Sequence, residues 1–347
     1  MIRNAVLLCV GIIVATCLAC APATESQSLL AVASTSAPSC SAAGFVGRVS
    51  YLAVPFSPGP GEPPPPTSEL PNGTTYGSDL AAAFAAASPA FQQQLCNLDA
   101  LYINAATCTS SEQCADDSWG WHQSRPTVGN GRVIALSVNL WAYRGHATPY
   151  SDFETDLTQA VLPLSGARYS GANVDTFSLT LLAALAHEMG HIRWYDLVAP
   201  NYPDPSKFCG GVFFSQGWTL PVSPPPPWRE LLTPVQRSRR GDHWSDMHLN
   251  PPHIRDIDRS SDPAYRAQQA FGLFTPNQPW ASVFASVSPD EDFVETYKFK
   301  VLTTAQPPLT SATLTIPGGG SVNLVGDYLS GRKPALAAKM GCIPASL

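Results

Sequence analysis

Two histidines and a glutamate lie close together in the run His187-Glu188-Met189-Gly190-His191. Residues four apart share a face of an α-helix, so His187 and His191 can direct ring nitrogens at one ion. Imidazole suits zinc, and two imidazoles leave room for a third protein ligand and a water molecule. Because zinc lowers the pKa of bound water to about 7, Glu188 could take a proton from that water at neutral pH. The run predicts one Zn²⁺ per chain, with Glu188 as a general base.

The segment around this run, Phe177 to Tyr195, is expected to form the strongest helix of the chain. It is rich in Leu and Ala and contains no Pro. The five-residue pattern can arise by chance, but burying two histidines and a glutamate in an apolar helix costs free energy unless they have partners. The helical setting therefore favours a metal site over a chance match.

A third ligand is offered by the run from Ser288 to Tyr297, Ser-Pro-Asp-Glu-Asp-Phe-Val-Glu-Thr-Tyr. Its Ser-Pro start predicts a helix, on which Glu291 and Glu295 share a face. Together the two runs resemble gluzincin-type metallopeptidases, in which a Glu ligand is followed four residues later by an acidic residue that accepts the other N–H of a ligating histidine. The resemblance implies Glu291 as the third metal ligand and Glu295 as the partner of the histidine.

An alternative to this ligand set remains open. Ser288 and Glu291 have the spacing of a capping box, in which Glu291 only caps its own helix and Glu295 becomes the third ligand. Other classes of zinc peptidase are less similar. Metzincins have Gly and His where this chain has Trp194 and Leu197, and the Gly-Thr-x-Asp run of the aspartate-ligand class does not occur.

The gluzincin resemblance covers only these two helices, and the other expected properties are implied by it. The implied fold is α+β and zincin-like, with a twisted mixed sheet packed on the active-site helix, extensive Pro-rich loops and a mainly helical C-terminal part. The implied activity is hydrolysis of peptide bonds in a protein or peptide substrate. In such enzymes the substrate pairs with the edge strand that precedes the active-site helix, which would be Arg132 to Tyr143 here.

Peptide hydrolysis also requires a donor that stabilises the oxyanion of the tetrahedral intermediate. His243 and His248 lie in one polar run, where a loop at the rim of the site could reach the metal. Tyr297, at the end of the second motif run, is a further candidate. Tyr195 and His253 complete the set of candidates.

The composition favours an exported globular protein. The 347 residues suffice for one large domain with a sizeable core, and 44% of them are hydrophobic. Only 13% are charged, about half the usual fraction, and 34 prolines require extensive loops. The net charge of -6 provides no basic field, so nucleic acid is not an expected partner. The protein is expected to be a monomer.

The N-terminus has the features of a bacterial export signal. Arg3 precedes an apolar run, Ala5 to Ala19, that is too short for a comfortable membrane span. The run ends in Cys17-Leu18-Ala19-Cys20, which resembles a lipoprotein processing site with Cys20 as the lipidated residue. Ordinary signal cleavage a few residues further on is the alternative. We therefore expect a periplasmic or cell-surface protein that contacts the membrane only through a lipid on Cys20, or otherwise a secreted protein.

The cysteine content agrees with export into an oxidising compartment. Six cysteines lie beyond the signal, an even number, and no Cys-x-x-Cys spacing suggests a zinc cluster. We expect up to three disulfides, with buried free thiols as the alternative. The six are Cys40, Cys96, Cys108, Cys114, Cys209 and Cys342.

After the export signal at 1–20, a mobile tether rich in Ala, Ser, Thr and Pro is expected over 21–42. A single catalytic domain is expected over 43–347, composed of a sheet with the active-site helix (43–196) and a C-terminal part with the third ligand (197–347). Strands are expected over 45–54, 101–105 and 132–143. Helices are also expected over 79–87, 88–98, 151–161, 263–271 and 334–340, with Ser151 and Glu154 as the capping box of the helix at 151–161.

The sequence therefore predicts an exported zinc metalloendopeptidase. Two other functions are compatible with the same residues. One is a zinc hydrolase with a non-peptide substrate, because the site determines how water is activated and not which bond is attacked. The other is a catalytically weak, zinc-binding surface lipoprotein.

Overall fold

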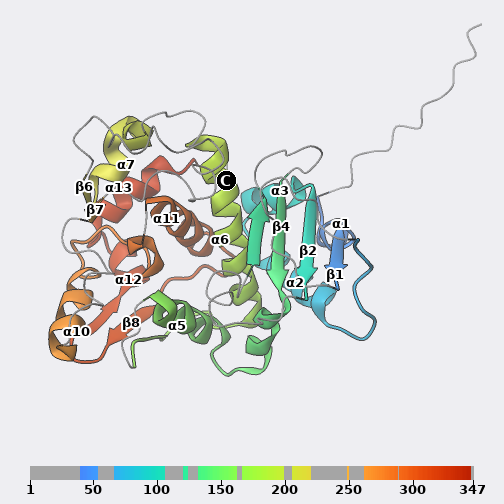
Figure 1. Ribbon diagram of the computed structural model, residues 1–347, viewed down its shortest axis with the longest axis horizontal. Helices are drawn as coiled ribbons and strands as arrows, with labels where there is room; N and C mark the ends of the chain where they lie inside the picture. Colours follow the sequence, from blue (N-terminus) through green and yellow to red (C-terminus); the bar gives the residue numbers. More distant parts are fainter. Residues whose placement is uncertain are drawn as a thin grey trace, which may run out of the picture. The chain divides into compact units, whose positions relative to one another are not determined.

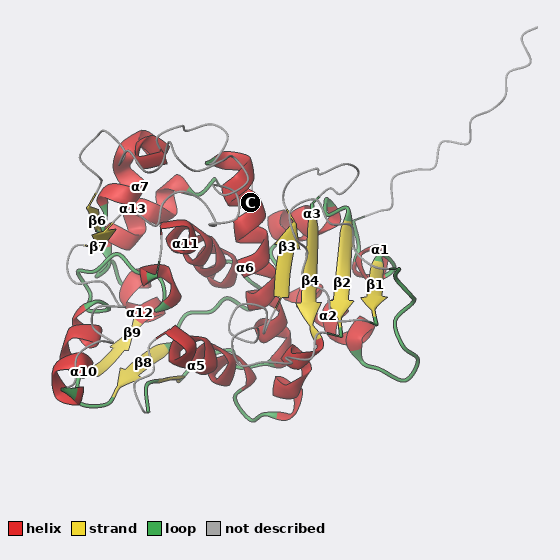
Figure 2. Ribbon diagram, in the orientation of Figure 1, coloured by secondary structure: helices red, strands yellow, loops and turns green. Residues whose placement is uncertain are grey.

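The computed structural model describes residues 40–53, 66–105, 120–123, 132–161, 166–198, 205–219, 248–249, 262–287 and 289–344 (Figure 1). The predicted export signal and most of the predicted tether lie outside these ranges. Residues Pro38–Leu347 cluster as one unit. Helices dominate it and the sheets are small, so the protein is α+β as predicted (Figure 2).

Helix α6 (Phe177–Leu197) is the central element, and its bounds confirm the predicted helix to within two residues. Its N-cap is Thr176, whose hydroxyl accepts from the N–H of Leu179. Buried residues occur on every face of α6, as expected for a helix surrounded by other elements. The helix contacts strands β3 and β4 on one side and α11 (Pro289–Thr303) on the other (Figure 1).

The sheet beside α6 has the strand order β1-β2-β4-β3 (Figure 2). β1 (Val49–Leu52), β2 (Ala100–Asn104) and β4 (Val133–Ser137) are parallel, and β3 (Gly120–Gln123) runs antiparallel to β4. Every residue of β4 is buried, as expected for an inner strand covered on both faces.

Two strand predictions on this sheet need correction. The strand expected over 132–143 ends at Ser137, where a 3₁₀ helix η1 (Val138–Gly145) begins because the Ser137 hydroxyl accepts from the N–H of Asn139. It is also an inner strand, so among the described strands β3 forms the edge near α6.

The other correction concerns the strand expected over 45–54. Its first residues are helical, in α1 (Ala42–Val46), which is capped by Ser41 and buries Phe45. The last residues of the predicted tether therefore already belong to the folded unit.

The predicted helices all occur, with ends shifted by a few residues. The helix expected over 151–161 begins at Pro149, and its first N–H groups, of Tyr150 and Ser151, donate to the carboxylate of Asp175. The predicted capping box of Ser151 and Glu154 is therefore wrong, because the Asp175 carboxylate caps the helix. Glu154 is buried and forms an ion pair with Lys298. The helices are α2 (Tyr76–Ala86), α3 (Pro89–Cys96), α5 (Pro149–Val161), α10 (Pro263–Gly272) and α13 (Pro334–Cys342).

Several short elements were not predicted from the sequence. A second sheet has the order β5-β8-β9, and β6 pairs with β7. These elements are β5 (Arg168–Ser170), η2 (Pro205–Gly211), α7 (Val212–Ser215), β6 (Trp218–Thr219), β7 (His248–Leu249), η4 (Phe284–Ser286), β8 (Thr313–Ile316), β9 (Gly320–Asn323) and α12 (Leu324–Leu329).

Two disulfides join distant segments. Cys40 is bonded to Cys96 and Cys209 to Cys342, with Cα–Cα distances of 5.5 and 5.6 Å. Cys108 and Cys114 lie outside the described residues. Disulfides are compatible with the predicted export. Within the described ranges, no helix combines the length and apolar character needed to cross a bilayer.

Candidate metal centre

Three side chains from helices α6 and α11 converge on one point. The Nε2 atoms of His187 and His191, both on α6, lie 3.3 Å apart. One carboxylate oxygen of Glu291, from the first turn of α11, lies 3.5 Å from His191 Nε2 and the other 3.8 Å from His187 Nε2. These three residues could hold a metal ion. The structure thus brings together all three metal ligands that the sequence predicted.

The spacing of the three donors fits one ion. Ligand distances of about 2.0–2.2 Å and tetrahedral angles place neighbouring ligand atoms about 3.3–3.6 Å apart. The distance between the two histidine nitrogens, 3.3 Å, and that from His191 to the nearer Glu291 oxygen, 3.5 Å, fall in this range. The other Glu291 oxygen lies 3.8 Å from His187, just above it. Two imidazoles with one carboxylate form a donor set that zinc accepts, with a fourth position left for water.

Glu295 lies one helical turn after Glu291 and contacts the other side of the His187 ring. Its Oε1 is 2.8 Å from His187 Nδ1. An ionised carboxylate can only accept, so Nδ1 carries the hydrogen, and in the neutral imidazole Nε2 then has a lone pair for a metal. This geometry gives Glu291 and Glu295 the two positions that the gluzincin resemblance implied. Ser288, the other residue of the capping alternative, lies outside the described residues.

The ligand side chains are only partly buried. The exposed fractions are 20% for His187, 13% for His191 and 17% for Glu291, whereas Glu295 has none. Their partial exposure leaves the three donors within reach of water, whereas a structural zinc site is closed by four protein ligands.

The electrostatics of the centre favour a cation. Burial opposes protonation of His187, but the hydrogen bond with Glu295 and the nearby carboxylates outweigh it and raise the pKa of His187 to about 9. Burial raises the pKa of Glu291 to about 8, against the opposing effect of His187. A bound dication favours the neutral imidazole and the ionised carboxylate, so binding would release protons from these groups.

Gly190 allows α6 and α11 to approach closely. A Cβ atom at this position would lie 3.0 Å from the Cα and 3.2 Å from the carbonyl oxygen of Val294. Because Val294 is in the turn between Glu291 and Glu295, this contact sets the distance from the histidines to both carboxylates.

We expect Gly190→Ala to destabilise the protein and weaken metal binding. Ala is favoured over Gly in a helix by about 1 kcal/mol. Overpacking a buried contact costs about 1–3 kcal/mol, and here the neighbour is helix backbone that cannot rotate away. Urea denaturation would measure the loss. The control is Gly341→Ala in α13, where a Cβ meets nothing within 4 Å, and which should be neutral or stabilising. Equal stability of the two variants would contradict this prediction.

The remaining predicted site residues are less closely connected to the ligands. Glu188 is buried on α6 directly after His187. Tyr297 is fully buried and its hydroxyl donates to Gln94, so it is not available as an oxyanion donor. Tyr195 is partly buried one turn after His191. The backbone of His248 pairs with β6, and His243 and His253 lie outside the described residues.

Three residues that surround Glu295 or its partner were not assigned to the site by the sequence analysis. Lys298 is 2.8 Å from Glu295 and 2.9 Å from Glu154, and the Ser282 hydroxyl also donates to Glu295. Burial would raise the pKa of Glu295, but Lys298 and the bond with His187 lower it to about 2. The spacing of Glu295 and Lys298, three residues apart, could have indicated that pair. No pattern in the sequence connects Lys298 to Glu154.

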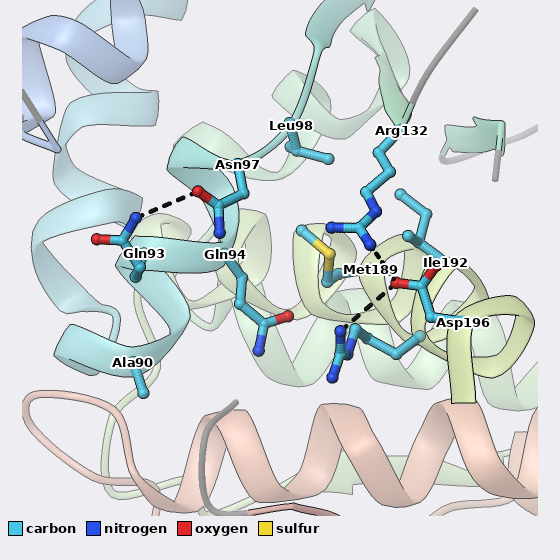
Figure 3. A pocket seen from close by; sticks show the side chains of 10 residues that line it. Ala90, Gln93, Gln94, Asn97, Leu98, Arg132, Met189, Ile192 and Asp196 are labelled. Atoms are coloured by element: carbon cyan, nitrogen blue, oxygen red, sulfur yellow. Dashed lines mark hydrogen bonds and ion pairs between the residues drawn. The ribbon is translucent and has the colours of Figure 1, made fainter. Parts of the chain in front are cut away.

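A separate cavity of about 310 Å³ lies on the other face of α6 (Figure 3). At about 100° per residue, Met189 and Asp196 project opposite to His187 and His191, and both line this cavity. Arg132 at its wall forms an ion pair of 3.0 Å with Asp196 (Figure 3). None of the metal ligands lines it, so this cavity is not part of the metal centre.

Comparison with known proteins assigns no family to the chain: no protein-family model, no curated protein and no solved structure matches it. The chemistry of the centre is therefore inferred from its own residues.

Proposed function

We propose that this protein is an exported, zinc-dependent metallopeptidase with a gluzincin-type site. The observation that supports it most is the approach of Glu291, on α11, to the two histidines of α6, together with Glu295 at the outer nitrogen of His187. A metal that fills this site would supply Lewis-acid activation of a water molecule. Zinc is the proposed metal because of the donor set.

The residues of the chain have distinct tasks in this proposal. His187, His191 and Glu291 hold the ion, and Glu188 takes the proton of the water and passes it to the leaving amine. Glu295 orients His187. We propose that the oxyanion donor is one of His243, His248 and Tyr195. The Tyr297 hydroxyl donates to Gln94 instead.

The proposed substrate is a peptide in extended conformation. The edge strand β3 contacts α6. We assign to β3 the pairing with substrate that the sequence analysis assigned to the segment 132–143. An unpaired strand edge can add a peptide through main-chain hydrogen bonds. Export and a lipid on Cys20 remain part of the proposal. The two disulfides support export.

Metal analysis and a peptide-library digest test the function. We expect about one zinc per chain in the purified protein, cleavage of peptides, loss of cleavage with a chelator, and recovery on adding zinc. Absence of stoichiometric zinc would contradict the metal site. Stoichiometric zinc without cleavage of any peptide would contradict the peptide substrate and direct the search to esters, other amides and glycans.

A further inference from the structure

A chain of buried charged side chains continues from the metal ligand His187 into the core. Glu295 accepts from His187, Lys298 lies 2.8 Å from the other oxygen of Glu295, and Glu154 lies 2.9 Å from Lys298. The side chains of Glu295, Lys298 and Glu154 are 0%, 4% and 4% exposed. Glu154 comes from α5, and the other two come from α11.

Stability alone does not account for such a cluster. Taking charges out of water costs several kcal/mol per ion, and apolar side chains of similar volume are often as stabilising as a buried ion pair. In this cluster one ammonium contacts two carboxylates, and one of these, Glu295, also contacts the N–H of His187. The cluster therefore has an electrostatic effect at a metal ligand that an apolar core would lack.

The carboxylate of Glu295 is held at both oxygens. Oε1 accepts from His187, and Oε2 accepts from Lys298 and from the hydroxyl of Ser282. Donors from three segments thus fix the plane of the carboxylate and, through it, the rotation of the His187 ring. The ring of Phe284 also packs edge-on against His187, with centroids 5.7 Å apart.

Lys298 in turn depends on Glu154. The cavity beside them has a volume of about 20 Å³, room for about one water molecule, so bulk solvent does not surround this pair. Without Glu154, the ammonium would have Glu295 as its one carboxylate partner among the described ion pairs. The ammonium of Lys298 could then shift away from the position in which it orients Glu295.

We propose that Lys298 and Glu154 are positioning residues of the metal centre, which hold Glu295 in the orientation that presents His187 to the ion. This inference rests on the proposed function, since it assigns their role to a site that binds zinc. Residues that act through a ligand in this way are worth about 10–100-fold in metal affinity.

The same helix offers a matched control. Asp292 and Lys339 form another fully buried ion pair, to which the indole of Trp218 also donates. Lys339 lies over the rings of Phe213 and Trp280, and within the described part of the chain its ion pair is with Asp292 and not with a proposed metal ligand. Its loss breaks a buried charge pair of α11 without touching the carboxylate that orients His187.

The experiment compares Lys298→Met with Lys339→Met in the full protein. A chelator competition titration measures zinc affinity, and nitrogen-correlated NMR of the zinc-loaded protein measures the Nδ1–H resonance of His187. We expect about 10–100-fold weaker zinc binding and a shifted or lost Nδ1–H resonance for Lys298→Met. For Lys339→Met we expect wild-type affinity and an unchanged resonance.

Lys298→Met leaves Glu154 buried without its partner and can fail to fold. The double variant Lys298→Met/Glu154→Gln removes both charges and keeps the volume, so it should fold and still show the weakened binding and altered resonance. Wild-type affinity with an unchanged resonance in the double variant would overturn the inference alone. Absence of zinc binding in the wild-type protein would overturn the proposed function, and the inference with it.

Discussion

Replacing Glu188 by Gln is expected to abolish peptide hydrolysis while zinc remains bound. Glu188 is not among the three metal ligands, and the amide has nearly the same shape as the carboxylate, so the site should stay intact. The amide cannot take a proton from water, and loss of a general base costs about 10²–10⁴-fold in rate. Steady-state hydrolysis together with zinc analysis of the same preparation measures both parts of this expectation.

The control for this variant is Asp196→Asn. Asp196 is another carboxylate of α6, but it projects from the opposite face and forms an ion pair with Arg132 at the separate cavity (Figure 3). We expect its hydrolysis rate to stay within about twofold of wild type, as for a partly exposed ion pair. Retained activity of Glu188→Gln with zinc bound would exclude Glu188 as the base.

Glu291→Ala is expected to lose zinc. Removing this ligand leaves two imidazoles, and the effect should exceed the 10–100-fold typical of an orienting partner. Zinc at 100 times its dissociation constant stabilises a protein by about 2.7 kcal/mol, which appears as a rise in melting temperature. The wild-type protein should show this rise, and Glu291→Ala should not show it at the same zinc concentration.

Two neighbouring acids serve as comparisons for Glu291→Ala. Asp290→Ala removes a carboxylate from the same turn of α11 without removing a ligand, and it should keep the zinc-dependent rise. Glu295→Gln should weaken zinc binding by about 10–100-fold. Weaker binding in Glu295→Gln than in Glu291→Ala would reverse the assignment of ligand and orienting residue.

The sequence predicted well what depends on neighbouring residues. The position of α6 follows from a long apolar segment without Pro, and the pairing of His187 with His191 is a local property of any helix. Ser88 with Pro89 predicted the start of α3 by the same kind of local chemistry. The gluzincin resemblance added Glu291 and Glu295, whose common face is again local to α11.

Local signals were wrong after Ser137 and at Ser151. The apolar residues after Ser137 were predicted to continue the strand, but they form a 3₁₀ helix, of which Leu140 and Tyr143 are the buried residues. Ser151 and Glu154 had capping-box spacing, yet Asp175 caps that helix and Glu154 pairs with Lys298. At Ser151 a contact made across the fold outweighed the local preference, whereas at Ser137 one local preference, the bond from the Asn139 N–H, outweighed another.

By itself, the sequence determined the donor types of the metal centre and the helices that carry them. Only the tertiary structure decided that Glu291 lies beside the Nε2 atoms of the two histidines while Glu295 contacts the Nδ1 atom of His187. This arrangement depends on how closely α11 approaches α6 at Gly190. The tertiary structure also decided that Glu154 reaches Lys298 across 144 residues. Distances between segments so far apart are set by packing of the whole core, and no pattern of neighbouring residues encodes them.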